Sequence, residues 1–591
     1  MTTLPWRLVR AAGALSLALL AGCGGGGGGG GGSDAPTGAS SQAAVNPTAR
    51  CPLAPAGSGS APANAGQAGI VSGRVSYERI PFYPLDNNLR GLNYNGRFAA
   101  PARGITVEAV APGCDGSVVA TASTDGDGWY ALDTKNAALP VCVRARAQLL
   151  QTGTPAWNIS VNDNTDANKL YVMADNTVAS ATASPSRNLF AASGWDGVAY
   201  TGARVAAPFA ILDSACKAID AVLDAQPAAQ FGSMSFFWSV RNTSEAGDPA
   251  LGKIGGAYYD PSLRGVYLRG DAAVNTDEFD EMVITHEFGH FVTQNFSRSD
   301  SIGGGHSLLD ITDPRLAFDE GWATAFAGRV LNTSVYRDSD EAQPLGAPNR
   351  EFAFDILADY SAQGVPTGWF AEASTQRALY NIAGLDGLGL SGVLHTFMSD
   401  AYRNSPALAT IFSLASQLKS DHAGAAAGIA RALDQESIDG DSVDRFAATE
   451  NHAPPLPAMP LATPALPLYQ TLSAGAALSV CSSNAYGVVN ALSNRRYLTF
   501  TPPVSGNYRF AVQPGTADSV AGVEVLNRGR HLYFQNATSA SPALTVNTAL
   551  TANEIYVLGI SHAGNTTDAP DAVTGSPGDQ RCFQISVGSG P

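Results

Sequence analysis

The pattern of hydrophobic and polar positions changes twice along the chain. Between residues 67 and 182, short runs alternate apolar and polar side chains and are separated by Gly, Pro, Asn and Asp. This alternation predicts half-buried strands joined by turns, as in a β-sandwich. The clearest runs are 70–80, 104–112, 117–132, 140–149, 156–163 and 169–175.

From residue 183 to 455 the apolar residues recur at the spacing of amphipathic helices. Two short strands are expected at 257–261 and 265–271, immediately before one of these helices. Helices are expected at 203–226, 277–292, 316–331, 373–384, 390–404 and 407–420.

A proline-rich hinge at 451–467 cannot continue a helix, and Tyr/Phe/Val alternation returns after it. The predicted fold class is therefore multidomain α+β. A β-sandwich precedes a mostly helical domain with a small sheet, and a C-terminal β-sandwich follows. The predicted boundaries are 1–22, 23–66, 67–182, 183–455 and 456–591. The first β segment resembles transthyretin-like, carboxypeptidase-regulatory modules in the order of its strand sequences.

The N-terminus has the features of an export signal. Arg7 and Arg10 precede a short apolar run, 11–22, that has too few residues to span a bilayer. The run ends in Leu-Ala-Gly-Cys, which resembles the bacterial lipobox and implies lipidation of Cys23. Residues 23–66 are rich in Gly, Ala, Pro and Ser and are expected to form a flexible tether. The expected location is exported and lipid-anchored, in the periplasm, at the outer membrane or at the cell surface.

Net charge and cysteine content indicate which partners and which disulfides are to be expected. The net charge of −16, without clustered Lys or Arg, argues against nucleic acid as a partner. Apart from Cys23, six cysteines remain, an even number that is compatible with disulfides in an exported chain. Cys114–Cys142 and Cys481–Cys582 are the expected pairs because each lies within one β-rich segment. Cys51 and Cys216 are not assigned.

Two histidines, His286 and His290, stand one helical turn apart in the helix at 277–292. Asn275 and Glu278 have the spacing of a capping box, and both histidines are expected on the inward stripe. Glu278, Asp280 and Glu281 are then expected to face water. Two buried imidazoles without partners would be unfavourable, and a shared Zn²⁺ would account for both.

A third metal ligand is needed, and several residues are candidates. His306 lies in a glycine-rich loop, which is less rigid than ligand sites prefer, whereas Asp310 and Asp313 lack the pattern of an aspartate-type site. Glu320 is the preferred candidate because the small residues Ala323, Thr324 and Ala327 share its helix face and permit close approach to the first helix.

His286-Glu287-Phe288-Gly289-His290 matches the HExxH motif of zinc proteases. Thr293 and Phe296 stand where metzincins have Gly and His, so that class does not fit. With Glu320 on the next helix, the pattern resembles the gluzincins. The 30-residue gap between the last histidine and Glu320 exceeds that of the thermolysin-like and aminopeptidase-like branches and leaves the subfamily open.

The resemblance implies one catalytic Zn²⁺, held by His286, His290 and Glu320, with a water at the fourth position. Glu287 would then be the general base of peptide hydrolysis. The strand 265–271 would be the edge strand that aligns an extended peptide.

Other residues are candidates for supporting roles in this chemistry. Asp319 is a candidate to orient a ligand histidine. His395, Tyr360 and Tyr380 are candidates for the group that stabilises the oxyanion.

The expected protein is thus a membrane-anchored, monomeric metallopeptidase that acts on peptide or protein substrates. Two alternatives remain open. The first is a non-catalytic surface protein that uses a zincin-like domain for adhesion. The second is a zinc amidase that acts on cell-wall peptide.

Overall fold

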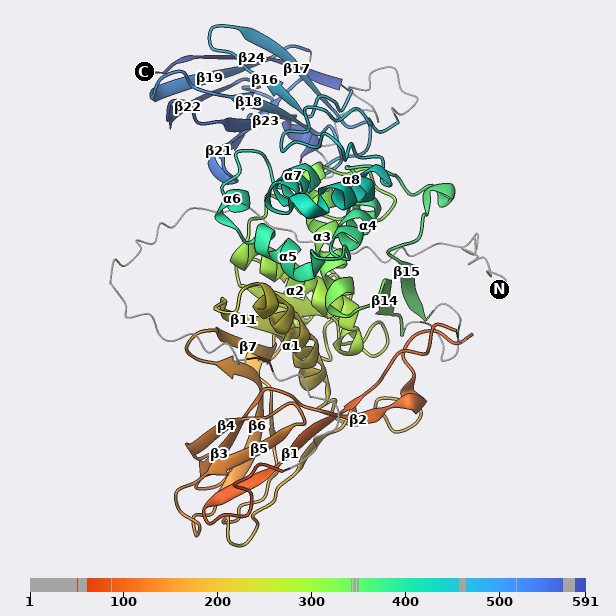
Figure 1. The fold of residues 1–591 in the computed structure, drawn as a ribbon, viewed down its shortest axis with the longest axis vertical. Coiled ribbons are helices and arrows are strands. Elements are labelled where there is room, and N and C mark those ends of the chain that lie inside the picture. The colour runs from red at the N-terminus through yellow and green to blue at the C-terminus, as the bar shows by residue number, and fades with distance from the viewer. Residues whose placement is uncertain are drawn as a thin grey trace.

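The computed structural model describes residues 50–51, 61–86, 88–341, 343, 347, 350–455, 464–516, 518–566 and 580–590. The predicted export signal, Cys23 and all of the tether except residues 50–51 and 61–66 lie outside this range. The described chain is a multidomain α+β protein, as the sequence predicts. Figure 1 shows the helices in the middle, the first sheets at one end and the C-terminal sheets at the other.

The first β-rich segment contributes to two sheets. In the smaller sheet, β1 (Ile70–Arg79) pairs with β2, β5 and β10. The larger sheet is nine-stranded and has the order β12-β13-β11-β7-β6-β3-β4, with β8 and β9 at its side. The remaining strands of these two sheets are β2 (Phe98–Pro101), β3 (Ile105–Ala111), β4 (Ser117–Ser123), β5 (Trp129–Asp133), β6 (Cys142–Gln151), β7 (Ala156–Asp163), β8 (Lys169–Leu170), β9 (Val172–Ala174), β10 (Leu189–Ala191), β11 (Gln230–Trp238), β12 (Tyr258–Asp260) and β13 (Gly265–Leu268).

The larger sheet crosses the predicted boundary between residues 182 and 183. Strand β7 pairs in parallel with β11, and α1 (Ala207–Ala225) lies between them in the chain. A parallel pair needs such a crossover, because the chain must return to the same end of the sheet. The two segments therefore share one sheet and one hydrophobic core.

Each predicted helix is present, with small changes in its limits. The segment expected as one helix at 390–404 is divided, because Ser399 accepts a hydrogen bond from the backbone N–H of Tyr402 and caps a new turn. Helix α8 (Ala426–Asp434) was not expected, and neither was the hairpin of β14 (Val335–Ser339) and β15 (Glu351–Asp355). The helices after α1 are α2 (Glu281–Phe296), α3 (Pro314–Val330), α4 (Glu372–Ile382), α5 (Gly389–Phe397), α6 (Asp400–Arg403), α7 (Ile411–Asp421) and α8 (Ala426–Asp434).

The C-terminal segment forms two sheets that enclose a separate hydrophobic core. One sheet has the order β16-β18-β23-β20-β21 and the other β17-β24-β19-β22. Their strands are β16 (Tyr469–Thr471), β17 (Ala477–Ser483), β18 (Arg495–Phe500), β19 (Gly506–Pro514), β20 (Ala521–Asn527), β21 (Arg530–Asn536), β22 (Leu544–Leu550), β23 (Tyr556–His562) and β24 (Gln580–Ser589).

Three disulfides connect six cysteines. Cys114–Cys142 and Cys481–Cys582 confirm the two predicted pairs. The third, Cys51–Cys216, joins the start of the described chain to α1. Among the described residues, no helix has the length and apolar composition needed to cross a membrane.

Candidate metal centre

Three side-chain atoms converge between α2 and α3. The Nε2 atoms of His286 and His290 lie 3.2 Å apart, and Oε2 of Glu320 lies 3.3 Å from each of them. All three side chains are buried. The structure therefore brings together the three residues that the sequence predicts as metal ligands.

These separations fit a zinc ion. An ion about 2.0–2.1 Å from three tetrahedral ligands holds the ligand atoms about 3.3–3.4 Å apart. Two imidazole nitrogens and one carboxylate oxygen are also ligands that Zn²⁺ favours. Three protein ligands leave a fourth coordination position, which is typical of catalytic zinc sites.

The packing of α2 on α3 sets this geometry. A Cβ atom at Gly289, between the two histidines in sequence, would lie 3.0 Å from Cα of Ala323 and 3.3 Å from its Cβ. These separations are shorter than ordinary van der Waals contacts, so a side chain at 289 would require the facing helix to shift by a few tenths of an ångström. The glycine opposite a small residue thus allows this close approach. The expectation that Ala323 permits close approach is therefore correct.

Neighbouring polar groups hold the ligand rings in place. Thr324 Oγ1 lies 3.0 Å from Nδ1 of His286. Asp319 Oδ2 lies 3.1 Å from Nδ1 of His290, and Ser299 donates a hydrogen bond to the other oxygen of Asp319. Partners of this kind fix the ring orientation and leave Nε2 available to bind a metal ion.

Glu287 follows the first ligand on α2 and is buried. Burial raises the pKa of its carboxyl group, while His286 and His290 oppose the rise and Glu320 adds to it. The pKa of Glu320 is shifted in the opposite direction. Burial alone would raise its pKa, but the facing His306 and His290 hold it well below its usual range.

His306 is the residue whose position differs most from expectation. It is 2% exposed, and its Nδ1 lies 2.9 Å from Oε2 of Glu372 on α4. Its Nε2 lies 3.4 Å from Oε1 of Glu320, the oxygen that is turned away from the two ligand histidines. Burial alone would lower the pKa of His306, but Glu320 and Glu372 raise it to about 9.

The loop that carries His306 is fixed by the C-terminal domain. Asn490 donates hydrogen bonds from Nδ2 to the carbonyl oxygens of Gly303 and Gly305, each 3.0 Å long. The backbone N–H of Leu492 also donates to the carbonyl of Ile311. The expectation of a loose loop is therefore wrong, because it considered only the local glycine content.

The N-terminus of α2 also differs from expectation. The helix begins at Glu281, after a short 3₁₀ turn at Asp277–Phe279, and the predicted capping box does not form. Instead, Asn275 donates a hydrogen bond to Asp338. Residues on all sides of α2 are buried, because α1, α3, β12 and β14 surround it.

The acidic residues expected to face water are mostly buried. Glu278 forms an ion pair with Arg204, and Asp280 accepts hydrogen bonds from the backbone N–H and hydroxyl of Ser339, each 2.9 Å long. Glu281 is half-buried beside Lys217. The prediction failed because these partners come from distant parts of the sequence.

The predicted edge strand is an interior strand. The residues 265–268 of the segment 265–271 form β13, which lies between β11 and β12. Strand β12 is the last strand on that side of the sheet. The reason is the β12–β13 hairpin: strand β12, which precedes β13 in the chain, pairs with the side of β13 that would otherwise be the edge of the sheet.

The three candidates for the oxyanion-stabilising group have other environments. The hydroxyl of Tyr360 accepts a hydrogen bond from the backbone N–H of Asp355, and His395 is exposed on α5. Tyr380 packs under the guanidinium of Arg329, whose central carbon is 3.7 Å from the ring centroid. His306 is the histidine that lies against the ligand cluster.

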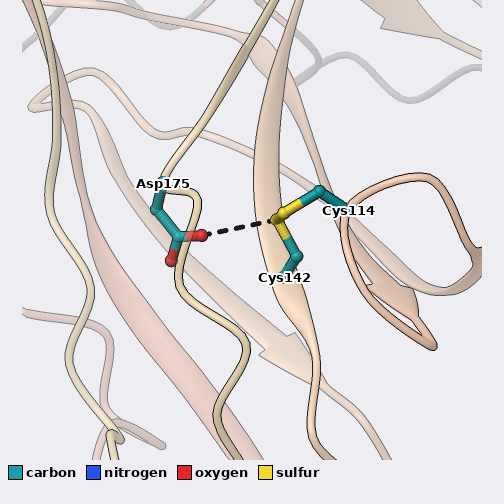
Figure 2. Close-up of side chains that lie close together, drawn as sticks. All are labelled: Cys114, Cys142 and Asp175. Carbon is teal, nitrogen blue, oxygen red and sulfur yellow. Dashed lines mark hydrogen bonds between the residues drawn. A yellow bond between two sulfur atoms is a disulfide. The ribbon is translucent and has the colours of Figure 1, made fainter.

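Within the part of the chain that the structure describes, two other clusters bring side chains of metal-binding type close together. In one, Asp175 lies beside Cys114 and Cys142, and Figure 2 shows that the two sulfur atoms form a disulfide. Those sulfurs are therefore not thiolate ligands. The other contains Asp277, Asp280 and Asp338, where Arg269 already forms ion pairs with Asp277 and Asp338.

Comparison with known proteins gives no family assignment. No protein-family model matches the chain. No curated protein matches it. The pre-peptidase C-terminal domain of a collagenase from Bacillus anthracis is similar over 20% of this chain and 93% of its own, with 8% identity and a TM-score of 0.15.

A second solved structure is PliG from Aeromonas hydrophila, a periplasmic inhibitor of g-type lysozyme. It is similar over 20% of this chain and 96% of its own, with 13% identity and a TM-score of 0.13. At these TM-scores, neither similarity supports a conclusion about fold or function.

Proposed function

We propose that the protein is a zinc-dependent peptidase of gluzincin type. The convergence of His286, His290 and Glu320 at 3.2–3.3 Å carries the proposal. A geometry that matches tetrahedral zinc is not expected of three side chains that merely share a core. Glu287, buried on the same helix, supplies the carboxylate that the reaction needs.

When bound, Zn²⁺ lowers the pKa of a water ligand to about 7 and polarises a carbonyl group. The protein residues then have distinct roles. Glu287 takes a proton from the attacking water and delivers it to the departing amine. Asp319 and Thr324 keep the ligand rings in position throughout.

His306 is proposed to contact the reacting peptide group through Nε2. Glu372 fixes the ring by its bond to Nδ1, and Nε2 lies 3.4 Å from Oε1 of Glu320 without forming a well-aligned hydrogen bond. A contact of this length satisfies the buried N–H only weakly, so a polar group of the substrate beside Nε2 would provide a better hydrogen-bond partner.

Replacing His306 by Phe should lower kcat by about 10²–10³-fold with a smaller change in KM, as for loss of one hydrogen-bonding group at a reacting oxygen. Steady-state hydrolysis of a fluorogenic peptide would measure both constants. Zinc content should stay at one ion per chain, and the exposed His395→Phe is the matched control. A variant that loses its zinc would show that His306 holds the metal.

The proposed activity is tested directly by zinc analysis and digestion of a peptide library. The purified chain should contain one zinc per molecule and cleave the library. Activity should disappear with a zinc chelator and return with added Zn²⁺. A chain that binds no zinc, or that cleaves cell-wall peptide and not the library, would contradict the proposal.

We also propose that the protein is exported and anchored by a lipid at Cys23. The apolar run 11–22 and the Leu-Ala-Gly-Cys sequence support the anchor. The three disulfides are consistent with an oxidising compartment, where such bonds persist.

A further inference from the structure

A surface pocket of about 450 Å³ lies at the edge of the nine-stranded sheet that is formed by β12 and β13. Its volume is within the range of roughly 300–1,000 Å³ that is usual for ligand sites. The walls come from the turn after β7, the segment 248–250 and the β12–β13 hairpin.

The pocket lies on the face of the sheet opposite the metal centre. Tyr259 packs toward α2, with its ring centroid 6.2 Å from that of Phe291. Successive strand residues point to opposite faces, so Tyr258 points away from α2. Tyr267 is the cross-strand neighbour of Tyr258 and shares this outer face.

Aromatic rings form one wall of the pocket. Phe237, Tyr267 and Tyr258 lie in one row across three neighbouring strands. Their rings stack in sequence, with centroids 4.7 Å apart for the first pair and 4.9 Å for the second. Tyr258 and Tyr267 line the pocket. Because Tyr267 is stacked on both faces, Tyr258 at the end of the row is the ring that can attract a cation.

Two carboxylates complete the lining. Asp248 and Asp260 each use Oδ1 to accept backbone hydrogen bonds from their own turns. Within the described residues, neither forms an ion pair. Asp248, Asp260 and Tyr267 line the same pocket. Burial raises the pKa of Tyr267, and Asp260 and Asp248 raise it further.

The basic side chains nearby have other partners. Lys253 forms an ion pair with Glu245, and Arg264 donates to carbonyl oxygens of Phe231 and Ser233. Arg241 donates to the carbonyl of Thr165. Arg241 and Arg264 keep their positive charge, because carbonyl oxygens are neutral, but the charged residues that line the pocket are Asp248 and Asp260. The lining also includes aromatic rings and the exposed side chain of Leu263, which can cover an aliphatic stem.

We propose that this pocket binds an arginine or lysine side chain of a polypeptide, at a site separate from the metal centre. The carboxylates pair with the cationic head, the Tyr258 ring contacts it, and Leu263 packs on the methylene groups. That the polypeptide is a substrate rests on the proposed peptidase function, whereas the binding itself does not.

Fluorescence polarisation of a short fluorescein-labelled peptide tests this site. The peptide consists of glycine and serine with one central arginine, and a matched peptide has citrulline, which lacks the charge. Both are titrated with full-length Glu287→Gln protein to prevent cleavage. The citrulline peptide should bind at least about 10-fold more weakly, because charged hydrogen bonds are lost.

Asp248→Asn and Asp260→Asn should each weaken binding of the arginine peptide and reduce its preference over citrulline. Both variants keep the Oδ1 acceptor of the turn, and thermal unfolding checks that they are folded. Asp386→Asn, at an exposed position outside the pocket, is the control. Equal binding of the two peptides, or unchanged binding by both variants, would overturn the proposal. Because zinc and Glu287 play no part, failure of the peptidase hypothesis would leave this result unaffected.

Discussion

Replacing Glu287 by Gln is expected to reduce kcat/KM for peptide hydrolysis by about 10²–10⁴-fold, the usual contribution of a general base. Glutamine has almost the same shape but cannot accept a proton at neutral pH. Because Glu287 is not one of the three converging ligands, zinc content should be unchanged. Hydrolysis of a fluorogenic peptide and zinc analysis on the same preparation would measure both quantities.

The control for this variant is Gln294→Ala, an exposed position on the same helix. It should retain activity and zinc. If Glu287→Gln hydrolyses the peptide at the original rate, Glu287 is not the base. If the variant loses both activity and zinc, the Glu287 carboxylate is needed for metal binding, and its assignment as the general base alone is wrong.

Replacing Glu320 by Gln should weaken zinc binding by at least about 100-fold, because even changes behind the ligands cost 10–100-fold. The amide removes the negative charge that faces His286, His290 and His306. Activity should fall with zinc occupancy. Competition with a fluorescent zinc chelator would measure the affinity, and excess Zn²⁺ should restore part of the activity.

Asp319→Asn is the graded comparison for Glu320→Gln. It contacts a ligand ring and not the metal, so its zinc affinity should fall by about 10–100-fold. Retention of full zinc affinity by Glu320→Gln, together with zinc loss in His306→Phe, would replace Glu320 by His306 as the third ligand.

The local elements of the fold could be predicted because they depend on short-range periodicity. The alternating run at 156–163 forms β7, and the helical run at 203–226 forms α1. The parallel partner of β7, strand β11, could not be identified, since register depends on contacts between residues distant in sequence. The shared sheet across residue 183 was missed for this reason.

The relative positions of the candidate residues were predicted correctly where one helix sets the spacing, and the surroundings of the acidic residues were predicted wrongly where charges meet through space. Residues one turn apart share a helix face, which places His286 near His290. Glu278 and Asp280 were expected in water because the sequence does not show that Arg204 and Ser339 reach them. Burial of these carboxylates depends on distant partners: Arg204 lies just before α1, and Ser339 is the last residue of β14.

The sequence by itself determined the HExxH helix, Glu320 on the next helix and two of the three disulfides. Only the tertiary structure decided the position of His306, which Glu372 and the distant Asn490 hold against the ligand cluster. The physical reason is the distance along the sequence between the residues that interact. Backbone geometry fixes neighbours one helical turn apart, whereas a loop is fixed by hydrogen bonds from parts of the chain whose proximity only folding creates.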